Sequence, residues 1–294
     1  MYWTTIQQIL VTGVLSSAVY FLLALGFALV FGVARIINLS HTALYMVAAY
    51  LIYTFMYMAS LNLILSVTLS VILTTIIGVT TYKLLVERIR EHEVTVIIVT
   101  LTIALVIQEC MLLLFSGRYY GIDSYIPGSF ELLGVTIAYQ HLLTLLVAII
   151  CTGVVSVFLL RTKLGLAIRV TAQDREIANL MGIDVNRMCV ISVAIASALS
   201  AIAGAFVAPI FVVQPHMWMS PLVLVMAIVV LGGLGSIKGA FIGALILGFA
   251  ETIVVFLAPN GSFLRESVAM VVMVITLLVR PDGLFGVAFE EERL

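Results

Sequence analysis

The sequence predicts an all-α integral membrane protein, a polytopic helical bundle with about eight spans that forms a single transmembrane domain over residues 1–294. Hydrophobic residues make up 63% of the chain and charged residues only 10%, against about 25% charged residues in soluble domains. Apolar runs of about 20 residues, the length that crosses a bilayer as a helix, recur along the whole chain. The sequence lacks the alternating pattern of a transmembrane β-barrel.

Polar segments separate the apolar runs and place each expected span. These segments are residues 86–94, 116–131, 161–188 and 258–267. The expected spans are 6–34, 43–60, 63–83, 94–115, 140–160, 189–213, 266–280, and one interrupted span made of 221–232 and 239–258. Because the first 34 residues contain no Lys or Arg, the opening run is expected to be a retained span and not a secretory signal peptide.

The distribution of Lys and Arg predicts the orientation, because cytoplasmic loops of membrane proteins are enriched in both. Arg118 and Arg265 are expected on the external side together with the N-terminus, whereas Arg35 and Lys238 fall at breaks in the apolar runs. Ten basic residues are expected on the cytoplasmic side: Lys83, Arg88, Arg90, Arg161, Lys163, Arg169, Arg175, Arg187, Arg280 and Arg293.

Two interruptions of the apolar pattern resemble each other, RIINLSH at 35–41 and LGGLGSIKG at 231–239. The apolar segment before the second, residues 222–231, would cover only about half of the hydrocarbon core as a helix. The pattern therefore predicts broken or re-entrant helices near 35–41 and 231–239, which are typical of transporters built from repeats. Two ordinary turns at the membrane surface are the alternative.

The residues of these two breaks form the first candidate site. Asn38 or Ser40 is expected to cap the helix that begins near His41, because lipid cannot satisfy the free N–H groups of a helix end. Arg35 is expected to face the headgroups or to cap the carbonyls of the preceding helix. The candidates for a translocation pathway or helix break are Asn38, Ser40, His41, Gly232, Gly233, Gly235, Ser236 and Glu251.

Glu251 is the most costly charge in an expected span, because an intramembrane carboxyl needs a partner or water. It shares a helix face with Gly248, so it is expected either to lock neighbouring helices together or to line a pathway, with the structural role favoured. Glu109 lies toward the outer end of its span and is weaker evidence. The pair Gly239 and Gly243 predicts close helix packing, with a pore-lining role as the alternative.

Several function classes are excluded or disfavoured by the sequence. The four histidines, His41, His92, His141 and His216, lack the spacing of a metal site, and the three cysteines sit singly in apolar runs. The chain contains neither a GxxxxGK(S/T) phosphate loop nor a GxSxG nucleophile motif. It is therefore expected to be no enzyme and to hold no metal or cofactor. Its net charge of −1 gives no reason to expect nucleic acid as a partner.

Residues 161–188 form the longest polar stretch and are predicted to contain a short amphipathic helix. Thr171 and Asp174 resemble a capping box at its start, and Gly182 is placed to end it. The apolar side chains Ile177, Leu180 and Met181 share one face of this helix. Such a face needs the bilayer or the groove of a partner to cover it, and the mixed charges near the start favour a protein partner.

This segment, RVTAQDREIANLMGIDVNR, resembles the cytoplasmic coupling loop of permeases in the branched-chain amino acid ABC importer family. Two further blocks are similar to that family and occur in its order: INLSH with Tyr45 and Met46, and LGGLGSIKGAFIGA near 231–244. One departure is that Thr42 and Ala43 stand where the family usually has Gly-Glu. The family matches in the loop are Arg169, Ala172, Asp174, Ala178, Gly182, Ile183 and Asp184.

The resemblance implies a membrane-spanning subunit of an ATP-driven importer for amino acids, branched-chain ones above all, or related small amides, in the inner membrane of a prokaryote. It implies a homologous permease as partner, two cytoplasmic ATPase subunits that bind ATP and Mg, and an external solute-binding protein. The residues implied to contact the ATPases are Arg169, Asp174, Ile177, Ala178, Leu180, Met181 and Gly182. The alternatives are a proton-coupled secondary transporter that uses Glu251 or Glu109, and a channel or membrane scaffold.

Overall fold

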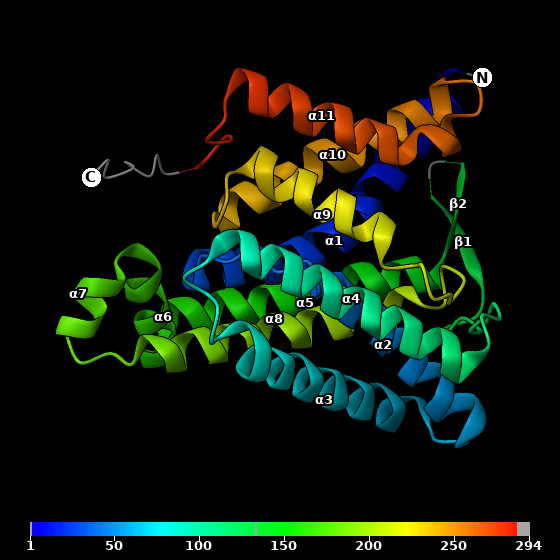
Figure 1. Cartoon of the computed structure of the whole chain (residues 1–294). Helices are drawn as coiled ribbons and strands as arrows, with labels where there is room; N and C mark the ends of the chain where they lie inside the picture. Colours follow the sequence, from blue (N-terminus) through cyan, green and yellow to red (C-terminus); the bar gives the residue numbers. More distant parts are fainter. Residues whose placement is uncertain (1, 133, 287–294) are drawn as a thin grey trace.

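The computed structural model describes residues 2–132 and 134–286, and these residues are mainly helical (Figure 1). The β-hairpin of β1 and β2 follows α4, and π-helical turns follow α2 and α3. The elements are α1 (Tyr2–Ala34), α2 (His41–Tyr53), α3 (Leu63–Thr81), α4 (Glu93–Phe115), β1 (Ser129–Leu132), β2 (Val135–Ala138), α5 (Tyr139–Arg161), α6 (Lys163–Gln173), α7 (Arg175–Leu180), α8 (Val185–Val207), α9 (Met219–Gly232), α10 (Ile237–Leu257) and α11 (Arg265–Val279).

Seven helices of the described residues are long and apolar enough to cross a membrane: α1, α3, α4, α5, α8, α10 and α11, some of them with their flanking turns. The helix α9 is apolar but has only 14 residues, and α2 has 13. The prediction of a polytopic helical membrane protein is thus confirmed.

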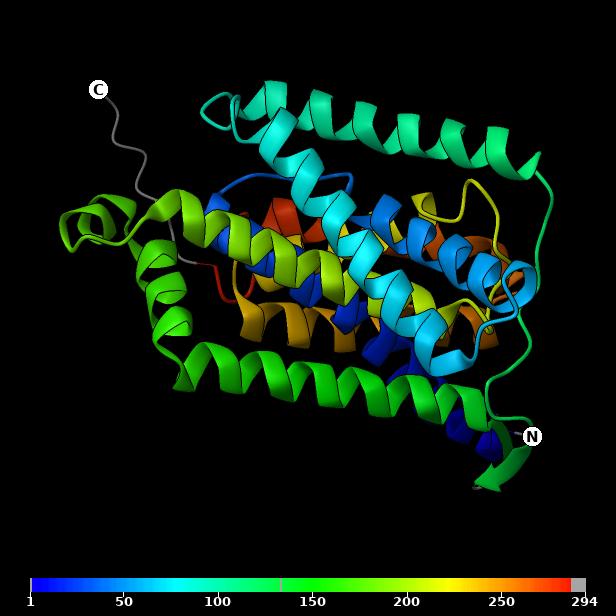
Figure 2. The same cartoon turned by 90° about the horizontal axis from the view of Figure 1, so that it is seen from below.

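The helix α1 lies in the middle of the bundle, in contact with α5, α8, α9 and α10 (Figures 1 and 2). Its residues 21–30 are all buried. The outer helices instead expose large apolar side chains, such as Ile64 on α3 at 80% and Leu278 on α11 at 80%. Facing inward, α3 buries only small residues, namely Ser66, Ser70, Thr74 and Gly78. Large apolar side chains outside and small residues inside are the opposite of the arrangement in soluble proteins. They are expected where lipid covers the outside and small residues let helices approach closely.

The helices α9 and α10 form an antiparallel pair, which corrects the expectation of one interrupted span. A Cβ on Gly232 would lie 2.2 Å from the backbone of Gly239, and a Cβ on Gly243 would lie 2.5 Å from the carbonyl oxygen of Ile228. Such contacts arise only when the two helices run side by side in opposite directions. The sequence showed the break but not the change of chain direction, because a short apolar run before a turn is compatible with one interrupted span and with two antiparallel helices.

Because α9 and α10 run in opposite directions, each basic residue can be assigned to one of the two ends of the bundle. We call the end that carries α6 and α7 the basic end, and the end that carries β1 and β2 the hairpin end (Figure 1). Arg118 and Arg265 lie at the hairpin end, as expected, and Arg293 lies outside the described residues. The basic end holds Arg35, Lys83, Arg88, Arg90, Arg161, Lys163, Arg169, Arg175, Arg187, Lys238 and Arg280.

Candidate functional site

The break at 35–41 lies deep inside the bundle. The ring nitrogen Nε2 of His41 is 3.2 Å from the carbonyl oxygen of Leu23, about 16 Å before α1 ends at Ala34. Residues 35–40 therefore run back from the basic end into the bundle, and α2 begins at mid-depth. His41 is 2% exposed, so its ring is enclosed between helices.

The backbone of this break is satisfied by side chains, as burial requires. The amide of Ser40 donates to Oδ1 of Asn38 at 3.1 Å, and the Ser40 hydroxyl donates to the same oxygen at 2.6 Å. The amide of Leu39 donates to the hydroxyl of Thr100 on α4 at 3.2 Å. The expectation that Asn38 or Ser40 caps α2 is therefore wrong: Ser40 stands at the N-cap position without a side-chain capping bond, and the side chain of Asn38, two residues earlier, accepts from Ser40 instead. Ser200 of α8 donates to the carbonyl of His41 at 2.8 Å.

The C-terminal end of α1 is capped from a distant part of the chain. Arg175, the first residue of α7, donates from Nη2 and Nε to the carbonyl oxygen of Val33 at 2.9 and 3.3 Å. Burial lowers the pKa of the Arg175 guanidinium. Arg35 was expected either to face the headgroups or to take this role; it is exposed, and its Nη2 donates to the carbonyl of Gln173 at the end of α6, at 3.4 Å. Both arginines thus connect the end of α1 to the segment 161–188.

The segment 161–188 contains two helices where one was expected. Asp174 has extended backbone angles and ends α6, and its carboxylate accepts from the amide of Ile177 at 2.9 Å to start α7. Thr171 lies inside α6, where its hydroxyl donates to the carbonyl of Ala167. The expected capping box at Thr171 and Asp174 is therefore wrong in its first member, because the hydroxyl bonds to the preceding turn of its own helix.

The end of α7 follows the expected pattern. Gly182 has a positive φ of 78°, its amide donates to the carbonyl of Asn179, and the amide of Ile183 donates to that of Ala178, both at 2.9 Å. These two bonds are those of a Schellman motif, for which glycine is the preferred residue. The chain therefore leaves α7 sharply and enters α8.

The apolar face of α7 points away from the bundle. Ile177 is 52% exposed, Leu180 88% and Met181 67%, whereas Ala178 is fully buried beneath them. Arg169 on α6 is exposed as well. Both views show α6 and α7 projecting beyond the ends of the long helices (Figures 1 and 2). We call Ile177, Leu180 and Met181 the α7 face, and its exposure at the end of the molecule is typical of a protein contact.

Glu251 makes the interhelical contact that the sequence favoured. It lies on α10 with 1% exposure and pairs with Nε of Arg265 on α11, with Tyr20 of α1 against it. Glu109 is exposed on α4, where it accepts from the side chain of Gln108 at 3.3 Å. Glu251, Arg265 and Tyr20 thus connect α10, α11 and α1.

The glycines of the second break build a turn at the basic end. Gly233 and Gly235 have φ values of 99° and 80°, and Gly235 lies against Gly32 near the end of α1. The hydroxyl of Ser236 accepts from the amide of Gly239 at 3.0 Å and starts α10. The predicted pathway residues therefore lie in three places, with Asn38, Ser40 and His41 at mid-depth, the second break at the basic end, and Glu251 toward the hairpin end. Their roles in transport remain predictions.

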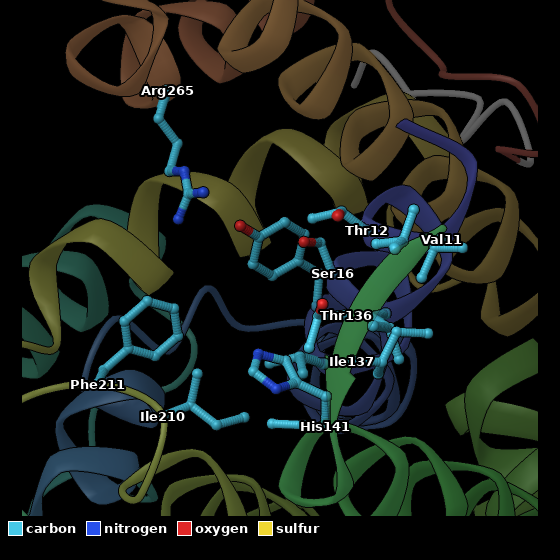
Figure 3. A pocket seen from close by; sticks show the side chains of 14 residues that line it. Val11, Thr12, Ser16, Thr136, Ile137, His141, Ile210, Phe211 and Arg265 are labelled. Carbon is cyan, nitrogen blue, oxygen red and sulfur yellow. The ribbon is translucent and has the colours of Figure 1, made fainter. Parts of the chain in front are cut away.

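Two cavities open near the hairpin end. The outer cavity, of about 570 Å³, lies between α1, α2, α9 and the segment 211–221. The side cavity, of about 290 Å³, lies between α1, β2 and the start of α5. Arg265 and Tyr20 line both, and Figure 3 shows Arg265 pointing into the side cavity from α11, with His141 across from it. No local pattern in the sequence marks this region, because its residues come from distant segments.

Comparison with known proteins agrees with the resemblance in the sequence. The chain is 28% identical to the high-affinity branched-chain amino acid transport system permease protein BraD of Pseudomonas aeruginosa, over 95% of both chains. It is 26% identical to the corresponding protein LivH of Escherichia coli K12, again over 95% of both. A probable branched-chain amino acid transport permease protein LivH of Methanocaldococcus jannaschii is 26% identical over 97% of this chain and 94% of that protein.

The fold is also similar to that of a solved structure, PsaBC from Streptococcus pneumoniae in complex with Fab. The TM-score is 0.54 at 13% sequence identity, over 96% of this chain and 97% of that one. The sequence profile of the family described as branched-chain amino acid transport system / permease component matches residues 9–279. Since this match covers nearly the whole bundle, the chain belongs to that family of permease components.

Proposed function

We propose that this chain is the membrane-spanning subunit of an ABC importer that moves amino acids, branched-chain ones or related small amides, into the cytoplasm. The family and the names of its relatives support the substrate class. The observation that carries the coupling to ATP is the exposed α7 face at the basic end. The chain itself holds no phosphate-loop motif, so in the proposed importer ATP is hydrolysed by partner subunits.

The proposed assembly contains a homologous permease, two ATPase subunits that bind ATP and Mg, and an external solute-binding protein. The basic end is assigned to the cytoplasm of a prokaryotic cell and the hairpin end to the outside, since Lys and Arg favour the cytoplasmic side. In this orientation the α7 face meets the ATPases, and Arg169, Asp174 and Gly182 shape the segment that carries it.

The contacts of Arg175 suggest how movement of the ATPases reaches the bundle. A displacement of α7 acts on the carbonyl of Val33 at the end of α1, and α1 contacts four other helices of the bundle, α5, α8, α9 and α10. Residues 35–40 connect the end of α1 to α2, so a shift of α1 displaces the start of α2. Such a change drives transport only if the ATPases contact the two states differently.

The decisive test changes the α7 face without disturbing α7 itself. Leu180→Asp puts a charge on the α7 face, where Leu180 is 88% exposed and the bundle does not need it. Asn179→Asp adds the same charge at an exposed position of the same helix, away from that face, and serves as the control. Copurification of the ATPases and ATP-dependent leucine uptake should fall at least about tenfold for Leu180→Asp and stay unchanged for Asn179→Asp.

Two results would contradict the proposal. The first is full ATPase binding and uptake by the Leu180→Asp variant. The second is leucine uptake by the purified chain alone in liposomes under a proton gradient, which is the behaviour of a secondary transporter. The pairing of Glu251 with Arg265 speaks against the second result, because a carboxylate held in an ion pair is poorly suited to carry protons.

A further inference from the structure

The outer cavity combines a charged rim with an apolar interior. Arg265 and Glu266, the first residues of α11, lie at its rim, and Leu23, Leu224 and Val225 line its interior. Its volume of about 570 Å³ falls within the roughly 300–1,000 Å³ typical of small-molecule sites. The lining suits a small molecule that has a charged head and an aliphatic body.

Arg265 is held in place for such a ligand. Its Nε contacts the buried carboxylate of Glu251, while about a third of its side chain, 34%, stays exposed. A guanidinium has five N–H donors. Figure 3 shows the Arg265 guanidinium pointing into the side cavity, and Arg265 lines the outer cavity as well. An arginine that served only to neutralise Glu251 would not need to line two cavities. A ligand carboxylate could take both terminal nitrogens in the bidentate geometry that guanidinium groups favour.

The charges around the rim also fit a ligand with two opposite charges. Since Glu251 already balances Arg265, the neighbouring Glu266 remains as an exposed anion at the rim. Its carboxylate can accept hydrogen bonds from an ammonium group. Tyr45, which is 3% exposed, adds a polar hydroxyl to a lining that also contains Tyr20, Gln214, His216 and Ser220.

We propose that the outer cavity binds an amino acid zwitterion, with Arg265 on the α-carboxylate, Glu266 on the ammonium group and the aliphatic lining against the side chain. This proposal rests on the proposed function and adds to it a substrate site within this chain. Substrate that arrives at the outer face is held there before it moves inward.

The competing explanation is that Arg265 only neutralises Glu251, and a double variant separates the two. Glu251→Gln combined with Arg265→Met removes both charges and keeps side chains of similar length. The complete transporter is reconstituted in proteoliposomes, and uptake of radiolabelled L-leucine is measured at saturating binding protein. The double variant should assemble like the unaltered chain, and its maximal uptake should fall about tenfold or more because the carboxylate loses its partner.

Two single variants sharpen this test. Arg265→Lys keeps the charge beside Glu251 but loses the bidentate geometry of the guanidinium, so uptake should fall about fivefold. This variant tests the proposal independently, should the double variant fail to fold. Glu266→Gln should reduce uptake about threefold, because an exposed charge contributes less than a buried one. Glu131→Gln, which changes an exposed acid on β1 at the same end, lines neither cavity and is the matched control.

Three outcomes would overturn the proposal. They are full uptake by a folded double variant, full uptake by Arg265→Lys, and a loss that is reversed by more binding protein, since that would make Arg265 a docking contact for that protein. Failure of the proposed function looks different, because the unaltered transporter itself would then show no ATP-dependent leucine uptake.

Discussion

The two breaks in the bundle resemble each other in sequence and differ in depth. Residues 35–40 lie inside the bundle, and their backbone is satisfied by Asn38 and by Thr100 of another helix. Residues 233–236 form a turn at the basic end, where two helices meet backbone to backbone. The expected break at 35–41 thus lies inside the bundle, and near 231–239 the apolar α9, with only 14 residues, ends in a turn that leads into α10. The first break is satisfied by side chains, whereas at the second the carbonyls of Leu231 and Gly232 accept from the backbone amides of Leu284 and Phe285.

The largest expected effect comes from filling the helix contact at the second break. In Gly232→Val the new side chain would meet the backbone of Gly239, which cannot move without separating α9 and α10. We expect a loss of about 3 kcal/mol in stability and a correspondingly lower melting temperature in detergent. Gly153→Val, at a position of α5 with open space around it, should leave the melting temperature unchanged. Equal melting of the two variants would refute the close contact.

Removal of the acceptor at the first break should have the next largest effect. Asn38→Ala leaves the amide and hydroxyl of Ser40 without their shared partner in a buried place, at a cost of about 2 kcal/mol. The comparison is Asn62→Ala, which removes a helix cap at an exposed position of α3. Water replaces that cap, so thermal unfolding should show a smaller loss. A larger loss for Asn62→Ala would mean that the break at 35–40 is open to water.

The partner of the break on α4 should contribute less. Thr100→Val removes the acceptor of the Leu39 amide and should cost about 1.5 kcal/mol. Thr102→Val changes the same residue type two positions along, where the hydroxyl faces outward and bonds within its own helix. Thermal unfolding of both variants measures the difference. If Thr102→Val proves the more damaging, the contact between α4 and the break is not as described.

The smallest effect is expected at the start of α10. Ser236→Ala removes a helix cap at a partly exposed position, where water can satisfy the amide of Gly239. We expect about 0.5 kcal/mol, the lower limit for such caps, measured by the same thermal unfolding. A cost as large as that of Asn38→Ala would place the second break in the membrane as well.

Local signals in the sequence were sufficient for most of the long helices and for the end of α7. Apolar length placed the long helices, and Gly182 marked the end of α7 because it acts on its nearest neighbours, whereas the start was expected at Thr171 and lies at Asp174. The depth of the breaks was not predictable in this way. Asn38 and Gly233 are both turn residues, and only the distant Thr100 and Ser200 place the first of them inside the bundle.

The same limit applies to the candidate sites. Val33 and Arg175 are 142 positions apart in the sequence, so no local pattern pairs them. Arg265 was expected only as an external loop residue, and its contact with Glu251 follows from the packing of α10 on α11. Residues of the α7 face were found from sequence because an exposed apolar stripe on a polar segment is visible without knowledge of the fold.

Hydrogen exchange resolved to single amides, on the protein in lipid nanodiscs, tests the difference between the two breaks most directly. The amides of Leu39, Ser40 and His41 are bonded within the bundle, whereas Leu234 and Gly235 lie in the partly exposed turn at the basic end. We predict that the first group exchanges about 100 times more slowly than the second, because exchange there requires the bundle to open. Equal rates in the two groups would contradict a break at membrane depth.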